Sequence, residues 1–332
     1  MKKFIFIILL HLPVYAVLAQ QIQILHEQPK TSFRGLSVVN DKVVWVSGNN
    51  GTIGRSTDAG TNWKWIKVKN YETIDFRDIE AFDSLNAVIM GIASPAYILR
   101  TADGGITWNK VYQNDHPEIF LDAMEFWNDQ SGIVIGDPIN GRFFIARTFD
   151  GGKSWQTLPE QNLPLADSAE ACFASSGTNI RKLKKDEAVF ITGGLSAHIF
   201  IRDKKIKLPI MQGSSSTGAN SIAVKDHKTM IVVGGDFNSK EDTTRNCIIT
   251  NDGGNTWTFP AVSPKGYRSC VEYLSKNKWI TCGLNGIDLS LDDGKNWKAI
   301  SSESFHVVRK AKKGKTVYFA GNNGKIAKLV SD

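Results

Sequence analysis

Three arginines, Arg34, Arg77 and Arg268, each follow an aromatic residue at equivalent places in three repeated segments. Packing alone would favour apolar side chains there, whereas a guanidinium group can hold a carboxylate through two parallel hydrogen bonds. Gathering such charges is costly without an anion, because like charges repel when partly desolvated. The sequence therefore predicts an anion-binding site formed by Arg34, Arg77, Arg268, His306, Asp122 and Arg142. The alternative is that each polar side chain only pairs with a neighbouring repeat.

Other chemistries lack the residues that they need. No Cys/His cluster has the spacing of metal ligands, and no glycine-rich loop precedes a helix. We therefore expect no metal and no cofactor, and a binding protein rather than an enzyme.

A short turn pattern, Ser/Thr-x-Asp-x-Gly-x-x-Trp, occurs five times and must position these residues. Within it, the aspartate can accept backbone hydrogen bonds, the glycine can take a positive φ, and the tryptophan can bury a large apolar surface. One degenerate copy is expected near Asp203. We interpret the aspartates as structural, not as calcium ligands, because each turn offers only one. They are Asp58, Asp103, Asp150, Asp252 and Asp292.

Seven apolar strands that end on glycine fall in register with these turns and predict an all-β, seven-bladed propeller. The last repeat lacks its outermost strand at the C-terminus. We expect residues 22–26 to supply it and close the ring. The connections after the glycines and between blades are the longest, so we place function on that face. Its expected inner-strand openings include Phe33-Arg34-Gly35, Phe76-Arg77-Asp78, Phe120-Leu121-Asp122, Glu170-Ala171-Cys172 and Tyr267-Arg268-Ser269.

Residues 1–19 are typical of a cleaved signal peptide, since Lys2 and Lys3 precede a short apolar stretch and small residues follow. We predict one propeller domain over residues 20–332, exported to the periplasm or secreted, without a stable membrane span. Removing the two lysines lowers the formal charge of +7 by two. Two basic runs, 181–185 and 309–313, are interpreted as solvated tips, not as a nucleic-acid surface. Cys270 and Cys282 fall on consecutive strands and can oppose each other.

The turns resemble the Asp-box, or bacterial neuraminidase repeat. The fuller pattern is similar to the photosystem II assembly and stability factor family and its non-photosynthetic bacterial relatives. The similarity rests on residues 33–39, on Trp45 with residues 48–51, and on the repeated turns. It implies an exported seven-bladed propeller that binds protein partners through an arginine-bearing face. The arginines themselves leave an anionic group of a partner protein or of a glycan as the expected ligand.

The alternative resemblance is to sialidase-like glycoside hydrolases, which share the turns and use three arginines to hold a carboxylate. That family opens with Arg-Ile-Pro, whereas this chain has Arg34-Gly35-Leu36. The family also needs a Tyr–Glu nucleophile pair and an Asp acid/base. The residue types available here are Tyr267, Glu170 and Asp122, but no local motif pairs them. We therefore favour binding over hydrolysis.

Overall fold

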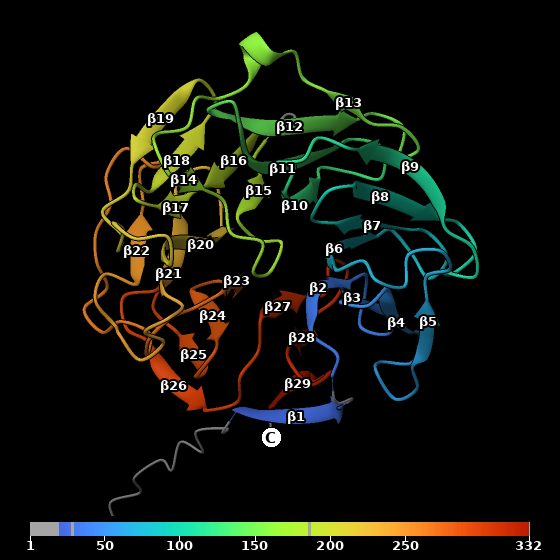
Figure 1. The fold of residues 1–332 in the computed structure, drawn as a ribbon. Helices are drawn as coiled ribbons and strands as arrows, with labels where there is room; N and C mark the ends of the chain where they lie inside the picture. The colour runs from blue at the N-terminus through green and yellow to red at the C-terminus, as the bar shows by residue number, and fades with distance from the viewer. Residues whose placement is uncertain (1–19, 28–29, 185–186, 332) are drawn as a thin grey trace, which may run out of the picture.

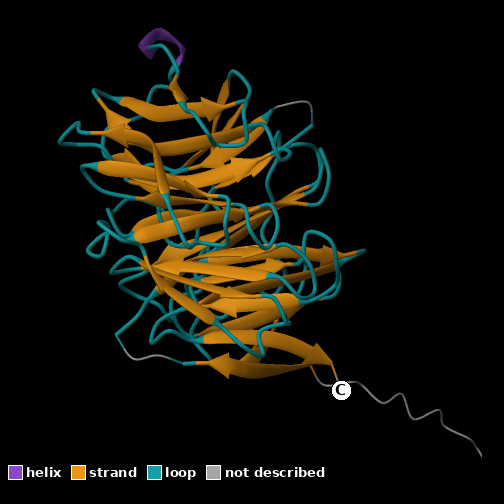
Figure 2. Cartoon of the chain, turned by 90° about the vertical axis from the view of Figure 1, so that its right-hand side faces the viewer, coloured by secondary structure: helices purple, strands orange, loops and turns teal. Residues whose placement is uncertain are grey.

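The computed structural model describes residues 20–27, 30–184 and 187–331, and these form a ring of seven antiparallel blades (Figure 1). This confirms the all-β, seven-bladed prediction. Edge on, the strands run from one face of the disc to the other (Figure 2). The described residues contain one helical turn, η1 (Glu160–Asn162), and none of their helices is long and apolar enough to cross a membrane. The expected signal peptide lies outside the described residues.

Blades one to three follow one another with four strands each, numbered outward from the axis. Blade one contains β2 (Phe33–Val38), β3 (Val44–Gly48), β4 (Thr52–Ser56) and β5 (Lys64–Lys67). Blade two contains β6 (Phe76–Ala81), β7 (Ala87–Gly91), β8 (Ala96–Thr101) and β9 (Asn109–Asn114). Blade three contains β10 (Leu121–Phe126), β11 (Gly132–Ile139), β12 (Arg142–Thr148) and β13 (Gln156–Thr157).

Blades four and five are the irregular part of the ring. Blade four contains β15 (Ile180–Lys182), β16 (Ala188–Ile191), β18 (His198–Ile201) and β19 (Lys204–Lys207). Blade five contains β20 (Thr217–Val224), β21 (Met230–Asp236) and β22 (Cys247–Thr250), and its sheet also takes in β14 (Glu170–Ala171) and β17 (Gly193–Gly194). The β18–β19 turn lies where the degenerate copy was expected, and Arg202 there has a φ of 56°.

Blades six and seven complete the circle. Blade six contains β23 (Cys270–Ser275), β24 (Lys278–Gly283), β25 (Gly286–Ser290) and β26 (Lys298–Ser301). Blade seven contains β27 (Val307–Lys310), β28 (Val317–Ala320), β29 (Ile326–Ser331) and β1 (Gln20–His26).

The N-terminal strand closes the ring as predicted. β1 pairs antiparallel with β29, with Ile22 opposite Leu329 and Ile24 opposite Ala327. In Figure 1 the blue β1 lies along the outer edge of the red last blade. Ile22 and Leu25 pack against the apolar core that blades six, seven and one share. The first and last strands of the propeller are therefore joined in one sheet.

The second strand of each blade contains the apolar run predicted from the sequence, and its burial explains that sequence. β3, β7 and β24 are buried almost throughout, because a neighbouring blade covers each face. A Cβ on Gly48 would lie 2.2 Å from the Ser32 carbonyl oxygen, and one on Gly283 would lie 2.2 Å from that of Tyr267. Glycine is needed here because the chain entering the inner strand passes too close for a side chain.

The five repeated turns share one hydrogen-bond arrangement. In each, the opening hydroxyl donates to the aspartate Oδ1 at 2.8 Å and accepts from the glycine N–H at 2.9–3.0 Å. The aspartate also accepts the backbone N–H four residues later at 2.9–3.0 Å. The glycines have φ between 77° and 89°. The hydroxyl and the carboxylate thus fix the turn together.

The four cysteines are free and buried. Cys270 and Cys282 are directly opposite each other in the β23–β24 pair, as expected from their positions, but the structure contains them as thiols.

Candidate functional site

The seven inner strands begin at one face of the ring, which we call the long-loop face; the five repeated turns lie on the opposite, turn face. Four inner strands open with a bulge, in which one residue is skipped by the pairing with the next strand. A bulge re-aims a side chain and is common beside binding sites. The skipped residues are Arg34, Arg77, Asp122 and Asn220.

Residues 173–178, which we call the axial segment, fill the centre of the ring. They precede β15 and reach toward the axis in Figure 1. Ser176 and Thr178 are almost completely buried, and Ser176 Oγ donates to the Ser269 carbonyl oxygen of blade six at 2.7 Å. The sequence-based expectation that Glu170 opens an inner strand is wrong, because Glu170 lies in β14 and the inner strand begins ten residues later at Ile180. The inserted segment separates the two ends of the axis.

Arg34 and Arg77 meet at the long-loop end of the axis. Arg34 Nη1 donates to the Ser175 carbonyl oxygen at 3.2 Å, so a blade-one side chain reaches the axial segment. Arg77 Nε lies 2.8 Å from Asp75 Oδ2, and both side chains are about one quarter exposed, at 27% and 28%. Burial, and then the charge of Arg77, lower the pKa of Arg34, while Tyr267 and Asp75 oppose the shift. Two guanidinium groups with few protein partners therefore share a partly desolvated site.

Tyr267 and His306 line the same end as neutral groups. The Tyr267 hydroxyl donates to Asn220 Oδ1 at 2.8 Å, and burial raises its pKa to about 12. His306 Nε2 lies 2.7 Å from Asn322 Oδ1, and burial followed by the charge of Arg34 lowers the pKa of His306 to about 3. Both side chains are uncharged at neutral pH, so Tyr267 does not cancel the positive charge of the arginines and His306 does not add to it.

Asp122 lies in this region with a second carboxyl group, Asp137. Asp122 is fully buried; burial and the neighbouring Asp137 raise its pKa well above the usual range, against the opposing effect of Arg77. Burial likewise raises the pKa of Asp137 to about 6, although its Oδ1 accepts from the Cys172 N–H at 2.8 Å. The shift favours the protonated form of Asp122, whereas Asp137, with a pKa of about 6, is mostly ionised at neutral pH. The pair therefore contributes one negative charge beside the two positive charges of Arg34 and Arg77.

The structure does not bring Arg268 and Arg142 into this cluster. Arg268 is fully buried, and its Nε and Nη2 lie 2.6 Å and 2.5 Å from Asp288 Oδ2 within blade six. Arg142 Nη1 donates to the Leu163 carbonyl oxygen at 2.8 Å and so supports the loop before β14. Arg268 therefore pairs inside its own blade, with Asp288, and not with a neighbouring repeat as the alternative expected.

The residues of the hydrolase alternative belong to separate networks. Glu170 accepts hydrogen bonds from Thr192 and Lys205 and lies 2.9 Å from His198 Nδ1. Glu170, Tyr267 and Asp122 are all buried. Among the described residues, these three make no hydrogen bond or ion pair with one another. A nucleophile pair is therefore not assembled.

Asp167, Glu170 and His198 are near enough to one another to offer metal ligands. The ammonium of Lys205 lies 2.7 Å from Asp167 Oδ1 and 2.8 Å from Glu170 Oε2. The ammonium of Lys205 thus already bridges the two carboxylates, and the cluster anchors β14 to blade four.

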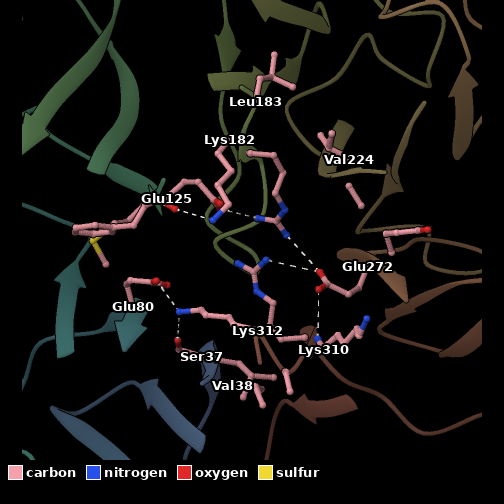
Figure 3. Close-up of a pocket in the computed structure, with 18 of the residues that line it drawn as sticks. Ser37, Val38, Glu80, Glu125, Lys182, Leu183, Val224, Glu272, Lys310 and Lys312 are labelled. Atoms are coloured by element: carbon pink, nitrogen blue, oxygen red, sulfur yellow. Dashed lines mark hydrogen bonds and ion pairs between the residues drawn. The ribbon is translucent and has the colours of Figure 1, made fainter. Parts of the chain in front are cut away.

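A cavity of about 550 Å³ opens at the turn-face end of the axis, and sequence reasoning missed it (Figure 3). Both basic runs contribute to it, so interpreting them as solvated tips was wrong for Arg181, which is only 7% exposed, and for the half-buried Arg309. The sequence placed both runs between a blade's first and second strands, whereas in the structure each run begins inside an inner strand, at the ends of β15 and β27.

No protein-family model and no curated protein matches this chain. Several solved structures are similar to it in fold. YCF48 bound to D1 peptide is 16% identical with a TM-score of 0.66, covering 97% of this chain and 100% of that chain. YCF48 from Cyanidioschyzon merolae is 14% identical with a TM-score of 0.64, covering 93% and 98%. The WD40 propeller domain of Doa1 is 12% identical with a TM-score of 0.63, covering 94% and 98%. At these identities the likeness establishes the propeller fold.

Proposed function

We propose that this protein is an exported, non-enzymatic propeller that binds an acidic segment of a protein partner at its long-loop face, through Arg34 and Arg77. Export rests on the composition of residues 1–19. The repeated turns belong to the Asp-box class in this proposal and serve as scaffold.

The observation that carries the proposal is the convergence of two guanidinium groups at the axis. In the described residues, the hydrogen bonds of the Arg34 side chain are limited to one neutral carbonyl oxygen, and Arg77 shares one ion pair with the partly exposed Asp75. Each group retains donors for a carboxylate, and an incoming anion would relieve the repulsion between them.

An aromatic surface beside the arginines suits a peptide. Phe237 is 39% exposed, and its ring centroid lies 6.3 Å from that of Tyr267 and 5.9 Å from that of Phe173. A carboxylate flanked by an apolar side chain would contact both features. That a propeller of the same fold, YCF48, has been solved with a D1 peptide supports a peptide rather than a glycan as the ligand.

The test uses a fluorescent Asp/Glu-rich peptide, its Asn/Gln counterpart and sialyllactose, each titrated into the mature chain. We expect the acidic peptide to bind best, more weakly as salt rises. The double variant Arg34→Gln/Arg77→Gln should lower its affinity roughly tenfold to hundredfold, as expected when charge-assisted hydrogen bonds are lost. Arg142→Gln is the matched control, because it removes a guanidinium from the same face but outside the cluster.

Unchanged peptide affinity in the double variant would refute the proposed site. Binding of sialyllactose but not of the peptide would replace the protein partner with a glycan. Release of sugar from a glycoside panel by the wild-type chain, lost in Glu170→Gln or Tyr267→Phe, would show that the protein is a hydrolase.

A further inference from the structure

The turn-face cavity is built by the whole ring. Each of the seven inner strands contributes its last residues to the lining, and Asp78 lies at the inner end beside the axial segment. A Cβ on Gly177 would lie 2.4 Å from the Asp78 carboxyl carbon, so the axial segment separates this cavity from Arg34 and Arg77. It is a second site, independent of the proposed peptide surface.

Positive charge predominates in the lining, where Lys and Arg outnumber Asp and Glu by seven to five. Burial raises the pKa of Asp78 to about 7, so this carboxyl is only partly ionised at neutral pH. The excess of positive over negative charge in the lining is larger as a result. In Figure 3, Lys182, Lys310 and Lys312 surround the same space as Glu125 and Glu272. The excess positive charge would favour an anion entering from solvent.

The guanidinium groups of Arg181 and Arg309 both face the Glu272 carboxylate but do not hydrogen-bond to it. Glu272 Oε2 lies 3.8 Å from Arg181 Nη2 and 3.8 Å from Arg309 Nη1. Both separations are too long for hydrogen bonds. Arg181 Nη2 is buried without a hydrogen-bond partner, although Nη1 contacts Glu125 at 3.5 Å. A buried guanidinium edge therefore remains unsatisfied inside the cavity.

The remaining wall is apolar. Leu36, Val38, Ile79, Met124 and Val224 line the cavity beside the charged groups. A volume of about 550 Å³ is within the range of small-molecule pockets. The site thus combines a place for one anionic group with contact area for an apolar body.

We infer that this cavity binds a small organic carboxylate with an apolar body, held by Arg181 and Arg309. A carboxylate is favoured over a phosphate because the two guanidinium groups are already arranged around a carboxylate oxygen. The wall carboxylates Glu125 and Glu272 would also repel a dianion more than a monoanion.

The experiment titrates hexanoate, hexanol and inorganic phosphate into the mature chain by isothermal calorimetry at constant ionic strength. Hexanoate should bind saturably, and more tightly than either comparison compound. Arg181→Gln should weaken hexanoate binding about tenfold, as expected for loss of a charge-assisted pair. Lys312→Gln, at a 40% exposed side chain, should weaken it less and serves if Arg181→Gln does not fold.

Two further variants distinguish a carboxylate site at Arg181 and Arg309 from a general loss of structure and from binding at the long-loop face. Glu272→Gln removes the competing carboxylate and should tighten hexanoate binding several-fold, a gain that misfolding cannot produce. Arg34→Gln, at the other end of the axis, should leave hexanoate binding unchanged while it weakens the acidic peptide. The inference is overturned if hexanoate does not bind saturably, if hexanol or phosphate binds as well, if Glu272→Gln weakens binding, or if Arg34→Gln does.

Discussion

The hydroxyl that opens each repeated turn is predicted to stabilise the fold, and Thr148→Val tests this. Thr148 is 1% exposed; its Oγ1 donates to Asp150 Oδ1 at 2.8 Å and accepts from the Gly152 N–H at 3.0 Å. Valine has nearly the same shape but no hydroxyl, and the buried Gly152 N–H would lose its partner.

The magnitude follows from these contacts. A buried donor left without an acceptor costs about 1–3 kcal/mol. Loss of the bond to Asp150 adds little, because water can reach that partly exposed carboxylate. The extra methyl group returns at most about 0.8 kcal/mol by burial. We therefore expect the free energy of unfolding to fall by about 1–2 kcal/mol, and the melting temperature by a few degrees.

Urea denaturation followed by tryptophan fluorescence measures the effect, with Thr148→Ser as the matched control. Serine keeps the hydroxyl and already occupies this position in the turns that begin at Ser56 and Ser290. The valine variant should be the less stable of the two, with an unchanged slope against urea. The serine variant loses one buried methyl group, about 0.8 kcal/mol, but keeps the hydroxyl. A valine variant as stable as the wild type, or at least as stable as the serine variant, would refute the hydrogen-bond explanation.

Two other predictions concern the closing strand and the response to acid. Deletion of residues 21–26 leaves β29 as an open edge and should lower the free energy of unfolding by several kcal/mol, on the order of a lost sheet strand; a deletion variant with wild-type urea stability would contradict the closure. Hydrogen bonds from Thr107 lower the pKa of Asp103 to about 2. Because an unfolded aspartate titrates near roughly 3.9, this stabilisation is complete above that pH and is lost as pH falls toward about 2. Asp103→Asn should therefore have a lower melting temperature than the wild type at pH 7. This difference in melting temperature should disappear as the pH approaches about 2, the pKa of Asp103 in the folded protein. A difference that does not change with pH would show that the ionised Asp103 carboxylate is not the stabilising group.

The sequence predicted the elements because their causes are local. A hydroxyl, an aspartate and a glycine within a few residues satisfy the hydrogen bonds of one turn, and the pattern recurs wherever that turn does. The glycine-ended strands were recognisable because close approach excludes a side chain in each blade. The closing strand followed from counting strands, since the last repeat ends one strand short. The equivalent positions of Arg34 and Arg77 in two repeats also predicted that their guanidinium groups lie near each other.

The axial segment, the pairing of Arg268 and the turn-face cavity could not be predicted, because they depend on which residues meet across the ring. Arg34 and Ser175 are 141 positions apart, and Ser176 and Ser269 are 93 apart, so no local pattern indicates that the axial segment fills the centre. Arg268 has the same sequence signature as Arg34, yet it pairs with Asp288 inside its own blade. The turn-face cavity arises only when seven inner strands end together around one axis. Sequence alone determined the local hydrogen bonds and strand pattern, whereas charge pairing and enclosed space were decided by tertiary structure, because both depend on distances between separate blades.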